Sequence, residues 1–454
     1  MRLLILLVLL VAGQVHGQTR QALVGGTLID GYGSTPIQDS VILVRDNTIE
    51  AVGTVATLPV PDEYEIISTE GMSVLPGLWD AHVHLMINGH GDYDHWFPAY
   101  MDRQVDEIMP ASARQLLMAG ITSARDLGAP LEYSITVRDR INAGEIPGPR
   151  MYMSGPFLQA EPYPGSDFYR WGVQSPREAR EKVDRLADAG VDLIKLVDQD
   201  QMPLEAARAL VARAHERGLR VVAHSHRPDE IRVGLDIGVD NFEHTGLTSA
   251  PEYPDDIMEA LKERTATGRV SGGPLYWTPT VEGLWNNDYT LANPEELDNS
   301  CWKEGLEPDT IADIEASLEH PQRLAYFDLT PRRKPTLIRK VSQLREAGVV
   351  LLVGTDSGIP MKFHCQSTWH ELDVWVNVMG IPAMEAIRAA TYWPAKFMGV
   401  NDRTGTIEPG KLADIVAVKG DVLRHINLLS RIDLVMKDGV IYKLQGQPTA
   451  AAGQ

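Results

Sequence analysis

The residues with the clearest chemical potential form a histidine pair. The segment from Asp80 to His84 places the imidazoles of His82 and His84 two positions apart, directly after an apolar run. Side chains two residues apart on a strand point to the same face, so this pair can bind one cation. An isolated pair of this kind is weak evidence for a metal, because histidine pairs without one are common.

Similar polar residues follow other apolar runs further along the chain. If those runs are parallel strands of a barrel, their C-terminal ends meet at one mouth, where barrel active sites lie. Four imidazoles, a carboxylate and an amine would then converge. These six candidate metal ligands are His82, His84, Lys195, His224, His244 and Asp356. Imidazole and carboxylate ligands suit zinc, the expected metal, although manganese, iron and cobalt bind at similar sites.

Six further residues lie near the predicted strand ends and are candidates for binding substrate. Arginine is suited to a substrate carboxylate because its planar fork accepts two oxygens. A tyrosine can line an apolar pocket, although aromatic residues are more often core. The candidates are Arg125, His226, Arg227, Tyr276, His364 and His370.

Eight strand-like apolar segments alternate with amphipathic helical segments between residues 73 and 400. This alternation predicts βαβ units, and eight of them predict an α/β fold of the (β/α)8 TIM-barrel type. A long insertion at about 282–330 is interpreted as a lid over the site. The eight strands are expected at 73–79, 121–124, 151–154, 192–196, 220–223, 240–243, 276–279 and 349–354.

The two terminal segments, 18–72 and 401–454, are rich in short apolar runs and turn residues. They predict a small β-sandwich domain built from both termini. Residues 1–17 have one positive charge, an apolar stretch and a small residue at the end, which is typical of a signal peptide. We therefore expect a periplasmic or secreted protein. Its two cysteines, Cys301 and Cys365, can pair only if their Cα atoms lie close together, which the sequence leaves open.

The formal net charge of −20 argues against nucleic acid or an anionic membrane as a partner, since both attract clustered Lys and Arg. A small-molecule substrate is expected instead. The sequence also lacks the Gly-x-Ser-x-Gly motif of serine hydrolases.

Several of these motifs resemble the amidohydrolase superfamily. The resemblance is closest to the imidazolonepropionase-like and Xaa-Pro dipeptidase-like (prolidase-type) branch with a binuclear metal centre, which includes peptidases of small peptides and N-acyl amino acids. It implies a metal-dependent hydrolase of amide C–N bonds and, by analogy, a homo-oligomer. The matching segments are 76–84, 120–126, 238–245, 354–358 and 405–414.

Lys195 matches the lysine that, in the binuclear members, takes up carbon dioxide to become a carbamate bridging two metals. A lysine desolvated at a barrel mouth has a lowered pKa, which makes its neutral amine available for this reaction. The resemblance implies that His82, His84 and Asp356 hold one metal, and that His224 and His244 hold the other. A metal-bridging hydroxide would attack the scissile carbonyl, and Asp356 would pass its proton to the leaving nitrogen.

Two alternatives remain at this point. The first is a mononuclear deaminase or cyclic-amide hydrolase of the same superfamily, but those enzymes lack a lysine at the fourth strand, where this chain has Lys195. The second is an inactive barrel that acts as a binding protein. Such a protein is expected to have lost metal ligands, whereas this chain keeps all six candidates.

Overall fold

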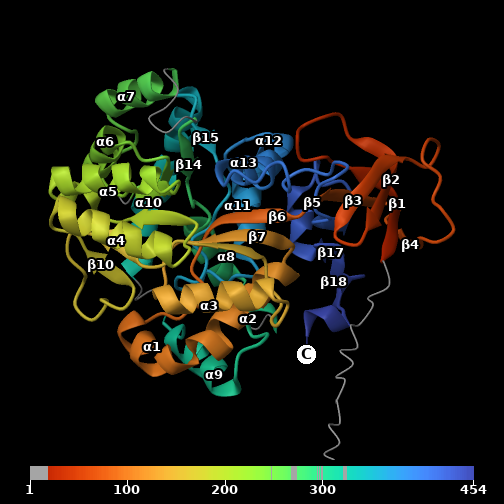
Figure 1. Ribbon diagram of the computed structural model, residues 1–454, viewed down its shortest axis with the longest axis horizontal. Helices are drawn as coiled ribbons and strands as arrows, with labels where there is room; N and C mark the ends of the chain where they lie inside the picture. Colours follow the sequence, from red (N-terminus) through yellow and green to blue (C-terminus); the bar gives the residue numbers. More distant parts are fainter. Residues whose placement is uncertain are drawn as a thin grey trace, which may run out of the picture.

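The computed structural model describes residues 19–453 apart from 247, 267–273, 294, 296, 298–299 and 321–324. The predicted signal peptide lies outside the described residues. Within these limits, no helix has the length and apolar character needed to cross a bilayer. Strands from both ends of the chain lie together at one side of the molecule, beside a larger body of strands and helices (Figure 1).

The terminal strands form one nine-stranded sheet. Its N-terminal members are β1 (Arg20–Leu28), β2 (Ile37–Arg45), β3 (Thr48–Thr54), β4 (Glu65–Ser68) and β5 (Met72–Pro76). Its C-terminal members are β16 (Ile415–Lys419), β17 (Leu434–Lys437), β18 (Val440–Leu444) and β19 (Gln447–Pro448). The order is β19-β18-β17-β16-β5-β1-β2-β3, with β4 beside β1.

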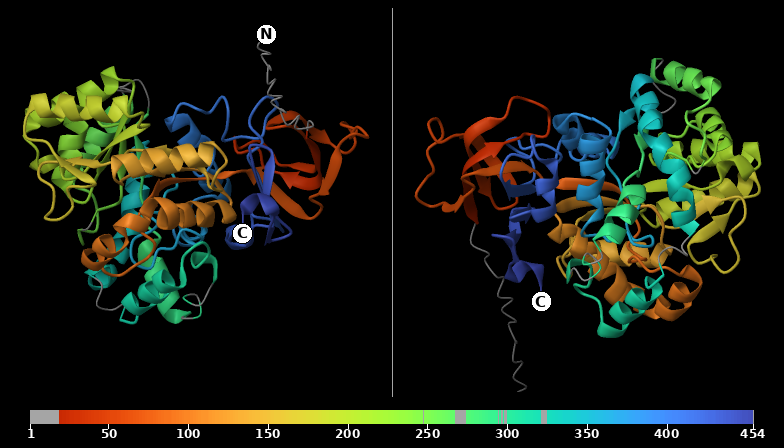
Figure 2. Two further views of the ribbon diagram at one scale, coloured as in Figure 1. Left: turned by 60° about the horizontal axis from the view of Figure 1, so that its bottom comes forward. Right: turned by 180° about the vertical axis from the view of Figure 1, so that it is seen from behind.

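One apolar core holds this sheet together. Leu23 and Ile42 from the N-terminal strands pack in the same buried cluster as Ile415 and Leu434 from the C-terminal strands. Burial of this shared apolar surface explains why the two ends of the chain associate. Figure 2 shows the red and blue strands side by side in two further views. The structure thus joins the terminal segments in a single sheet, where the sequence predicted a β-sandwich.

The other strands are all paired in parallel. β6 (Leu78–Val83), β7 (Ile121–Asp126) and β8 (Arg150–Met153) form a three-stranded sheet. The second sheet has the order β10-β9-β11-β12-β13-β14-β15. Its strands are β9 (Phe157–Gln159), β10 (Arg170–Gly172), β11 (Leu193–Leu196), β12 (Arg220–His224), β13 (Asn241–Glu243), β14 (Tyr276–Thr278) and β15 (Val350–Leu351). The α/β class with parallel sheets is therefore confirmed.

Backbone hydrogen bonds connect these two sheets at both ends. The Asp192 N–H donates to the Met153 carbonyl at 2.9 Å, between β8 and β11. The Ala81 N–H donates to the Val353 carbonyl at 2.9 Å, between β6 and the segment that follows β15. The first and last of the eight predicted strands are therefore neighbours.

The predicted strand at 73–79 is in fact two strands in different sheets. β5 pairs with β16 in the nine-stranded sheet, whereas β6 pairs with β7. Gly77 lies between them, and a Cβ atom at this position would come within 2.1 Å of Thr122 Oγ1. Only glycine allows the backbone to pass this close to β7 as the chain crosses between the sheets.

Helices alternate with the parallel strands as predicted. For example, α4 lies between β10 and β11, and α5 lies between β11 and β12. α4 begins where the Ser175 side chain accepts a hydrogen bond from the Glu178 N–H, a typical N-cap. The helices are α1 (Tyr93–Tyr100), α2 (Met109–Met118), α3 (Leu131–Asn142), α4 (Pro176–Asp188), α5 (Leu204–Glu216), α6 (Pro228–Ile237), α7 (Asp255–Ala266), α8 (Gly283–Ala292), α9 (Pro308–Ser317), α10 (Ala325–Glu346), α11 (Ser367–Asp373), α12 (Ala383–Ala389) and α13 (Tyr392–Phe397).

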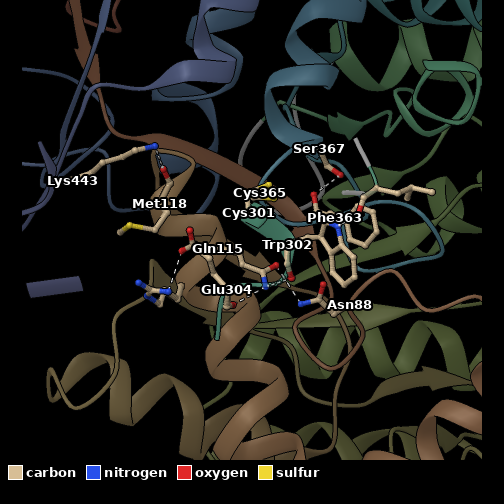
Figure 3. Close-up of a disulfide and its surroundings, with 12 residues drawn as sticks. Asn88, Gln115, Met118, Cys301, Trp302, Glu304, Phe363, Cys365, Ser367 and Lys443 are labelled. Atoms are coloured by element: carbon tan, nitrogen blue, oxygen red, sulfur yellow. Dashed lines mark hydrogen bonds and ion pairs between the residues drawn. A yellow bond between two sulfur atoms is a disulfide. The ribbon is translucent and has the colours of Figure 1, made fainter. Parts of the chain in front are cut away.

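The predicted insertion at 282–330 contains α8 and α9 and is tied to the body of the molecule. Cys301 and Cys365 form a disulfide, with Cα atoms 6.1 Å apart, which joins the insertion to the segment after β15 (Figure 3). Next to the disulfide, Trp302 stacks on Phe363 with ring centroids 4.8 Å apart. Gln115 of α2 donates to the Trp302 carbonyl at 2.7 Å. The question about the cysteines that the sequence left open is thereby answered.

Candidate metal centre

All six predicted metal ligands lie at or near the C-terminal ends of parallel strands. His82 lies in β6 and His84 follows it; Lys195 lies in β11 and His224 ends β12. His244 and Asp356 follow β13 and β15. The side chains of His82 and Lys195 are fully buried, whereas that of Asp356 is 18% exposed. The parallel strands therefore deliver these groups to one edge of the fold, as expected for a barrel mouth.

Asp356 is at the centre of this cluster. One of its carboxylate oxygens, Oδ1, lies 3.4 Å from His82 Nε2 and 3.1 Å from His84 Nε2. The other, Oδ2, lies 3.9 Å from His244 Nδ1. The ring of His224 lies 4.7 Å from that of His244, measured between centroids. The carboxylate and the four imidazoles are therefore close enough to share bound cations.

Several buried nitrogens in this cluster have no hydrogen-bond partner among the described residues. They are His82 Nε2, His84 Nδ1, Lys195 Nζ and His224 Nδ1. An unpaired buried polar group costs roughly 1–3 kcal/mol, so native structures normally satisfy such atoms. Imidazole nitrogens and a carboxylate are ligands for divalent transition metals, and the donor set fits two such ions.

Burial keeps the nitrogen ligands in the forms that bind metals. It is the main reason why the pKa values of His82, His224 and His244 fall well below the ordinary histidine value, with the positive charge of Lys195 adding to the effect. Burial also lowers the pKa of Lys195 to about 8. The imidazoles of His82, His224 and His244 are therefore neutral at pH 7, and part of the Lys195 population has a free amine.

Asp356 remains ionised although it is buried. Burial raises the pKa of this carboxyl, but the hydrogen bond and charge of His84 outweigh that effect, together with the positive charges of Lys362 and Lys195. The net shift is downward. A carboxylate that stays charged in this position can bind a cation and accept a proton.

Glu243 orients the first of the candidate metal ligands, His82. Its Oε2 lies 2.9 Å from His82 Nδ1, and its Oε1 accepts a hydrogen bond from Arg125 Nη2 at 2.9 Å. A carboxylate behind a metal-binding histidine fixes the tautomer and leaves the opposite nitrogen free for the metal. Glu243 was not among the residues predicted for the site, although a charged residue inside an apolar strand was a usable signal.

Asp80 supports the same edge of the fold. It accepts hydrogen bonds from the hydroxyl of Thr355 at 2.7 Å and from that of Thr368 at 2.8 Å. It also accepts the His82 N–H at 3.1 Å. Through these bonds Asp80 connects β6 to the segment that carries Asp356, and so fixes the two ligands relative to each other.

A pocket of about 210 Å³ opens onto the metal ligands. One wall is aromatic and includes Tyr93, Phe97, Phe157 and Tyr169. The lining also contains cationic side chains and residues of the insertion, namely Arg170, Gly283, Leu284, Thr330, Arg333 and Lys362. Gly283, Leu284 and Thr330 come from the two ends of the predicted insertion.

Of the six predicted substrate-binding residues, His226 lies in the pocket lining. Its ring stacks on that of His244 at 4.6 Å, and burial lowers its pKa to about 4. A neutral imidazole next to the metal ligands can donate or accept one hydrogen bond to a substrate.

The other five predicted residues lie away from the pocket lining and have structural contacts. Arg125 is fully buried against Glu243, and Arg227 forms ion pairs with Asp198, Asp200 and Glu230. Tyr276 packs edge-on against Phe397 in the core. His364 bonds to Ser357 Oγ and the Ile87 carbonyl, and His370 packs between Tyr289 and Trp369.

Comparison with known proteins identifies one family. Residues 73–442 match the sequence model of a family described as the amidohydrolase family. The chain is 22% identical over 437 residues to the imidazolonepropionase of Micrococcus luteus, which covers 88% of this chain and 92% of that protein.

Two solved structures are similar over almost their whole length. One is a candidate prolidase from Bifidobacterium longum, with a TM-score of 0.72 and 28% identity, covering 95% of this chain and 96% of the other. The second is a Xaa-Pro dipeptidase with methionine bound in its active site, with a TM-score of 0.73 and 25% identity. That match covers 94% of this chain and 100% of the other.

Proposed function

Because the chain belongs to the amidohydrolase family, we propose that it cleaves the amide C–N bond of small substrates, namely dipeptides or N-acyl amino acids. The general class, a hydrolase acting on C–N bonds, follows from the family and confirms the sequence prediction. The observation that carries the finer proposal is the convergence of four imidazoles, Lys195 and Asp356 around buried, unpartnered nitrogens. The names of the Xaa-Pro dipeptidase and of its prolidase-type relative support the choice of substrate.

The parallel strands support a closed (β/α)8 barrel as the scaffold of this site. Two backbone hydrogen bonds, one between the segments of Met153 and Asp192 and one between those of Ala81 and Val353, join the two parallel sheets at both ends. The disulfide between Cys301 and Cys365 supports a secreted or periplasmic location, because such bonds persist in oxidising compartments.

In the proposed centre, His82, His84 and Asp356 would hold one divalent metal, and His224 and His244 would hold the other; the ligand types favour zinc. Two such cations, when bound, polarise the scissile carbonyl and lower the pKa of water to near neutrality. The Lys195 amine would attack carbon dioxide, forming a carbamate and releasing one proton. The two oxygens of the carbamate would then be available as further ligands.

The residues of the chain then perform the proton transfers and the positioning. Asp356 accepts the proton of the attacking water and delivers it to the leaving nitrogen, which lets that nitrogen depart as a neutral amine. Glu243 keeps the His82 ring in place during this exchange. The aromatic wall excludes water from the reacting carbonyl and packs against the apolar part of the substrate.

The experiment that tests this function measures metals and hydrolysis together. Plasma mass spectrometry would give the metal content of the full chain and of Lys195→Met, alongside hydrolysis of a panel of dipeptides and N-acyl amino acids. We expect close to two metals per chain, as in the binuclear members of the family. Both metal content and activity should fall in the variant.

Lys340 provides a matched control. Its side chain is also buried, its pKa is also lowered to about 8 mainly by burial, and its Nζ donates to the Thr248 carbonyl away from the metal ligands. Lys340→Met should keep both metals and the activity. About one metal per chain in both the wild type and Lys195→Met would contradict the binuclear proposal and favour the mononuclear deaminase alternative.

A further inference from the structure

Arg170 is a charged side chain in the pocket without an acidic partner. It begins β10, lines the pocket, and forms no ion pair with any residue that the structure describes. Its Nη1 donates to Gln159 Oε1 at 2.7 Å, a neutral acceptor. Its Nε is buried and has no hydrogen-bond partner in the same described part of the chain. This donor is therefore available to a ligand.

Aromatic rings hold the guanidinium in place. Its central carbon lies 4.3 Å from the ring centroid of Tyr163, 4.8 Å from that of Phe157 and 5.0 Å from that of Tyr169. Such contacts favour a cation over a ring face but provide no negative charge. The rings thus fix the position of the guanidinium while its charge remains uncompensated.

The other cations of the pocket are already engaged. Lys362 lies 3.2 Å from Glu282, and Arg333 donates from Nε to the Gly246 carbonyl at 3.0 Å. Asp198 accepts a hydrogen bond from the Tyr163 hydroxyl and is paired with Arg227 at 2.9 Å. Asp198, the acidic residue that Tyr163 connects to Arg170, is therefore already paired with another arginine.

Phe157 connects Arg170 to the metal ligands. The same ring that contacts the guanidinium lies 5.8 Å from the His84 ring and 6.4 Å from the His224 ring, measured between centroids. A single aromatic ring thus separates the free cation from the centre. This short separation suits a substrate whose negative charge lies only a few bonds from the scissile carbonyl.

We propose that Arg170 binds the α-carboxylate of the amino acid on the leaving side of the scissile amide. The inference rests on the proposed hydrolase function and makes its substrate class narrower. The enzyme would require a free C-terminal carboxylate, and would act on dipeptides and N-acyl amino acids but poorly on their C-terminal amides. A guanidinium matches a carboxylate in charge, and its two N–H groups can donate to both carboxylate oxygens. A neutral carboxamide has a single oxygen and accepts only one of these two hydrogen bonds.

The test compares each hydrolysed substrate with its C-terminal carboxamide, in the wild type and in Arg170→Gln. For the wild type we expect the carboxamide to lose about 10- to 100-fold in kcat/KM, the size of a charge-assisted hydrogen bond. In Arg170→Gln the carboxylate substrate should lose a similar factor, mainly through KM, and the two substrates should become nearly equal. Arg170→Lys should recover part of the preference.

Arg185 of α4 is the matched control. It also stacks on an aromatic ring, that of Trp171 beside Arg170, with its central carbon 4.4 Å from the ring centroid, but it is exposed and lies outside the pocket lining. Arg185→Gln should keep the wild-type preference. If Arg170→Gln also kept an undiminished preference for the carboxylate, the proposal would be wrong while the hydrolase function stood.

A binding measurement separates the two proposals. Calorimetry with L-leucine and L-leucinamide needs no turnover, so it reports on the carboxylate site alone. Binding of L-leucine that is lost in Arg170→Gln, in a protein that hydrolyses nothing in the panel, would retain the carboxylate site and reject the hydrolase. Equal binding of both compounds, or binding that Arg170→Gln leaves unchanged, would overturn the role of Arg170.

Discussion

Replacing Glu243 with Gln tests how far the metal ligands depend on the residues behind them. The substitution keeps the shape but removes a fully buried negative charge that faces both His82 and Arg125. Arg125 is itself fully buried, so the variant leaves a buried guanidinium without its counter-charge. Removing one partner of a buried ion pair costs about 3–5 kcal/mol, and the remaining Gln oxygen keeps one of the bonds. We therefore expect a loss of about 3 kcal/mol in the free energy of unfolding.

The same substitution should weaken metal binding. If the Gln amide donates to His82 Nδ1, the ring proton moves to Nε2, the nitrogen that faces Asp356 at 3.4 Å. A protonated Nε2 cannot bind a metal, so we expect affinity to fall by about 10- to 100-fold, the usual effect of losing such a carboxylate. Chelator competition at pH 7 measures the affinity, and urea unfolding of the metal-free protein measures the stability.

Asp240 supplies the control for this experiment. It is buried and lies 2.9 Å from His215 Nε2, in a carboxylate–histidine pair outside the metal centre. Asp240→Asn should lose stability but keep its metal affinity. Equal metal affinity in Glu243→Gln and the wild type would refute the reasoning, since the supposed link between Glu243 and the His82 tautomer would then be absent.

Three further predictions follow from single observations. The pKa of Lys195, lowered to about 8 by burial, means that its neutral fraction rises about tenfold per pH unit below that value. At a fixed concentration of dissolved carbon dioxide, the rate of metal loading of the apo protein should therefore rise from about pH 6 to about 8 and then level off, and a rate that does not change with pH would contradict this. The disulfide between Cys301 and Cys365 closes a segment with a sequence separation of 64, so Cys301→Ser with Cys365→Ser should lower the unfolding free energy by about 4 kcal/mol, as measured by denaturant midpoints with and without reductant. Gly77→Ala should lower the unfolding free energy by at least about 1–3 kcal/mol, because the alanine Cβ would approach Thr122 Oγ1 to 2.1 Å. A variant with the same thermal midpoint as the wild type would show that the backbone at residue 77 has space for a side chain.

The candidate metal centre could be assembled from the sequence because each candidate ligand directly follows or ends an apolar run. His82, His224 and Asp356 are far apart in the chain, yet parallel strands bring the residues at their C-terminal ends to one edge. The position relative to a strand end therefore predicts convergence without any knowledge of side-chain contacts. Arg125 has an equivalent position, the penultimate residue of β7, but its side chain is buried against Glu243 and lies outside the pocket lining. Position along a strand alone does not distinguish these two outcomes.

The lining of the candidate pocket could not be predicted in this way. Arg170 lies in β10, which has three residues and pairs only with β9, another strand of three. Segments this short have no periodicity that distinguishes a strand from a loop. The crossing at Gly77 was missed for a related reason, since the apolar run continues through it while the chain changes sheets. The local sequence pattern of a strand does not show which other strand it pairs with.

The backbone conformation of His244 and Asp356 shows how two candidate ligands are held although they lie beyond the ends of the paired strands. His244 and Asp356, which lie just beyond β13 and β15, have φ angles of 72° and 63°, in a region that residues other than glycine adopt at a cost of about 1–3 kcal/mol. Each is fixed there by a backbone bond to a neighbouring strand: the His244 N–H donates to the Thr278 carbonyl at 2.8 Å, and the Asp356 N–H to the His82 carbonyl at 2.7 Å. The neighbouring strands thus hold two strained turns that direct an imidazole and a carboxylate toward the same point. A rigid placement of this kind favours metal binding, because the ligands need not be ordered when the cation arrives.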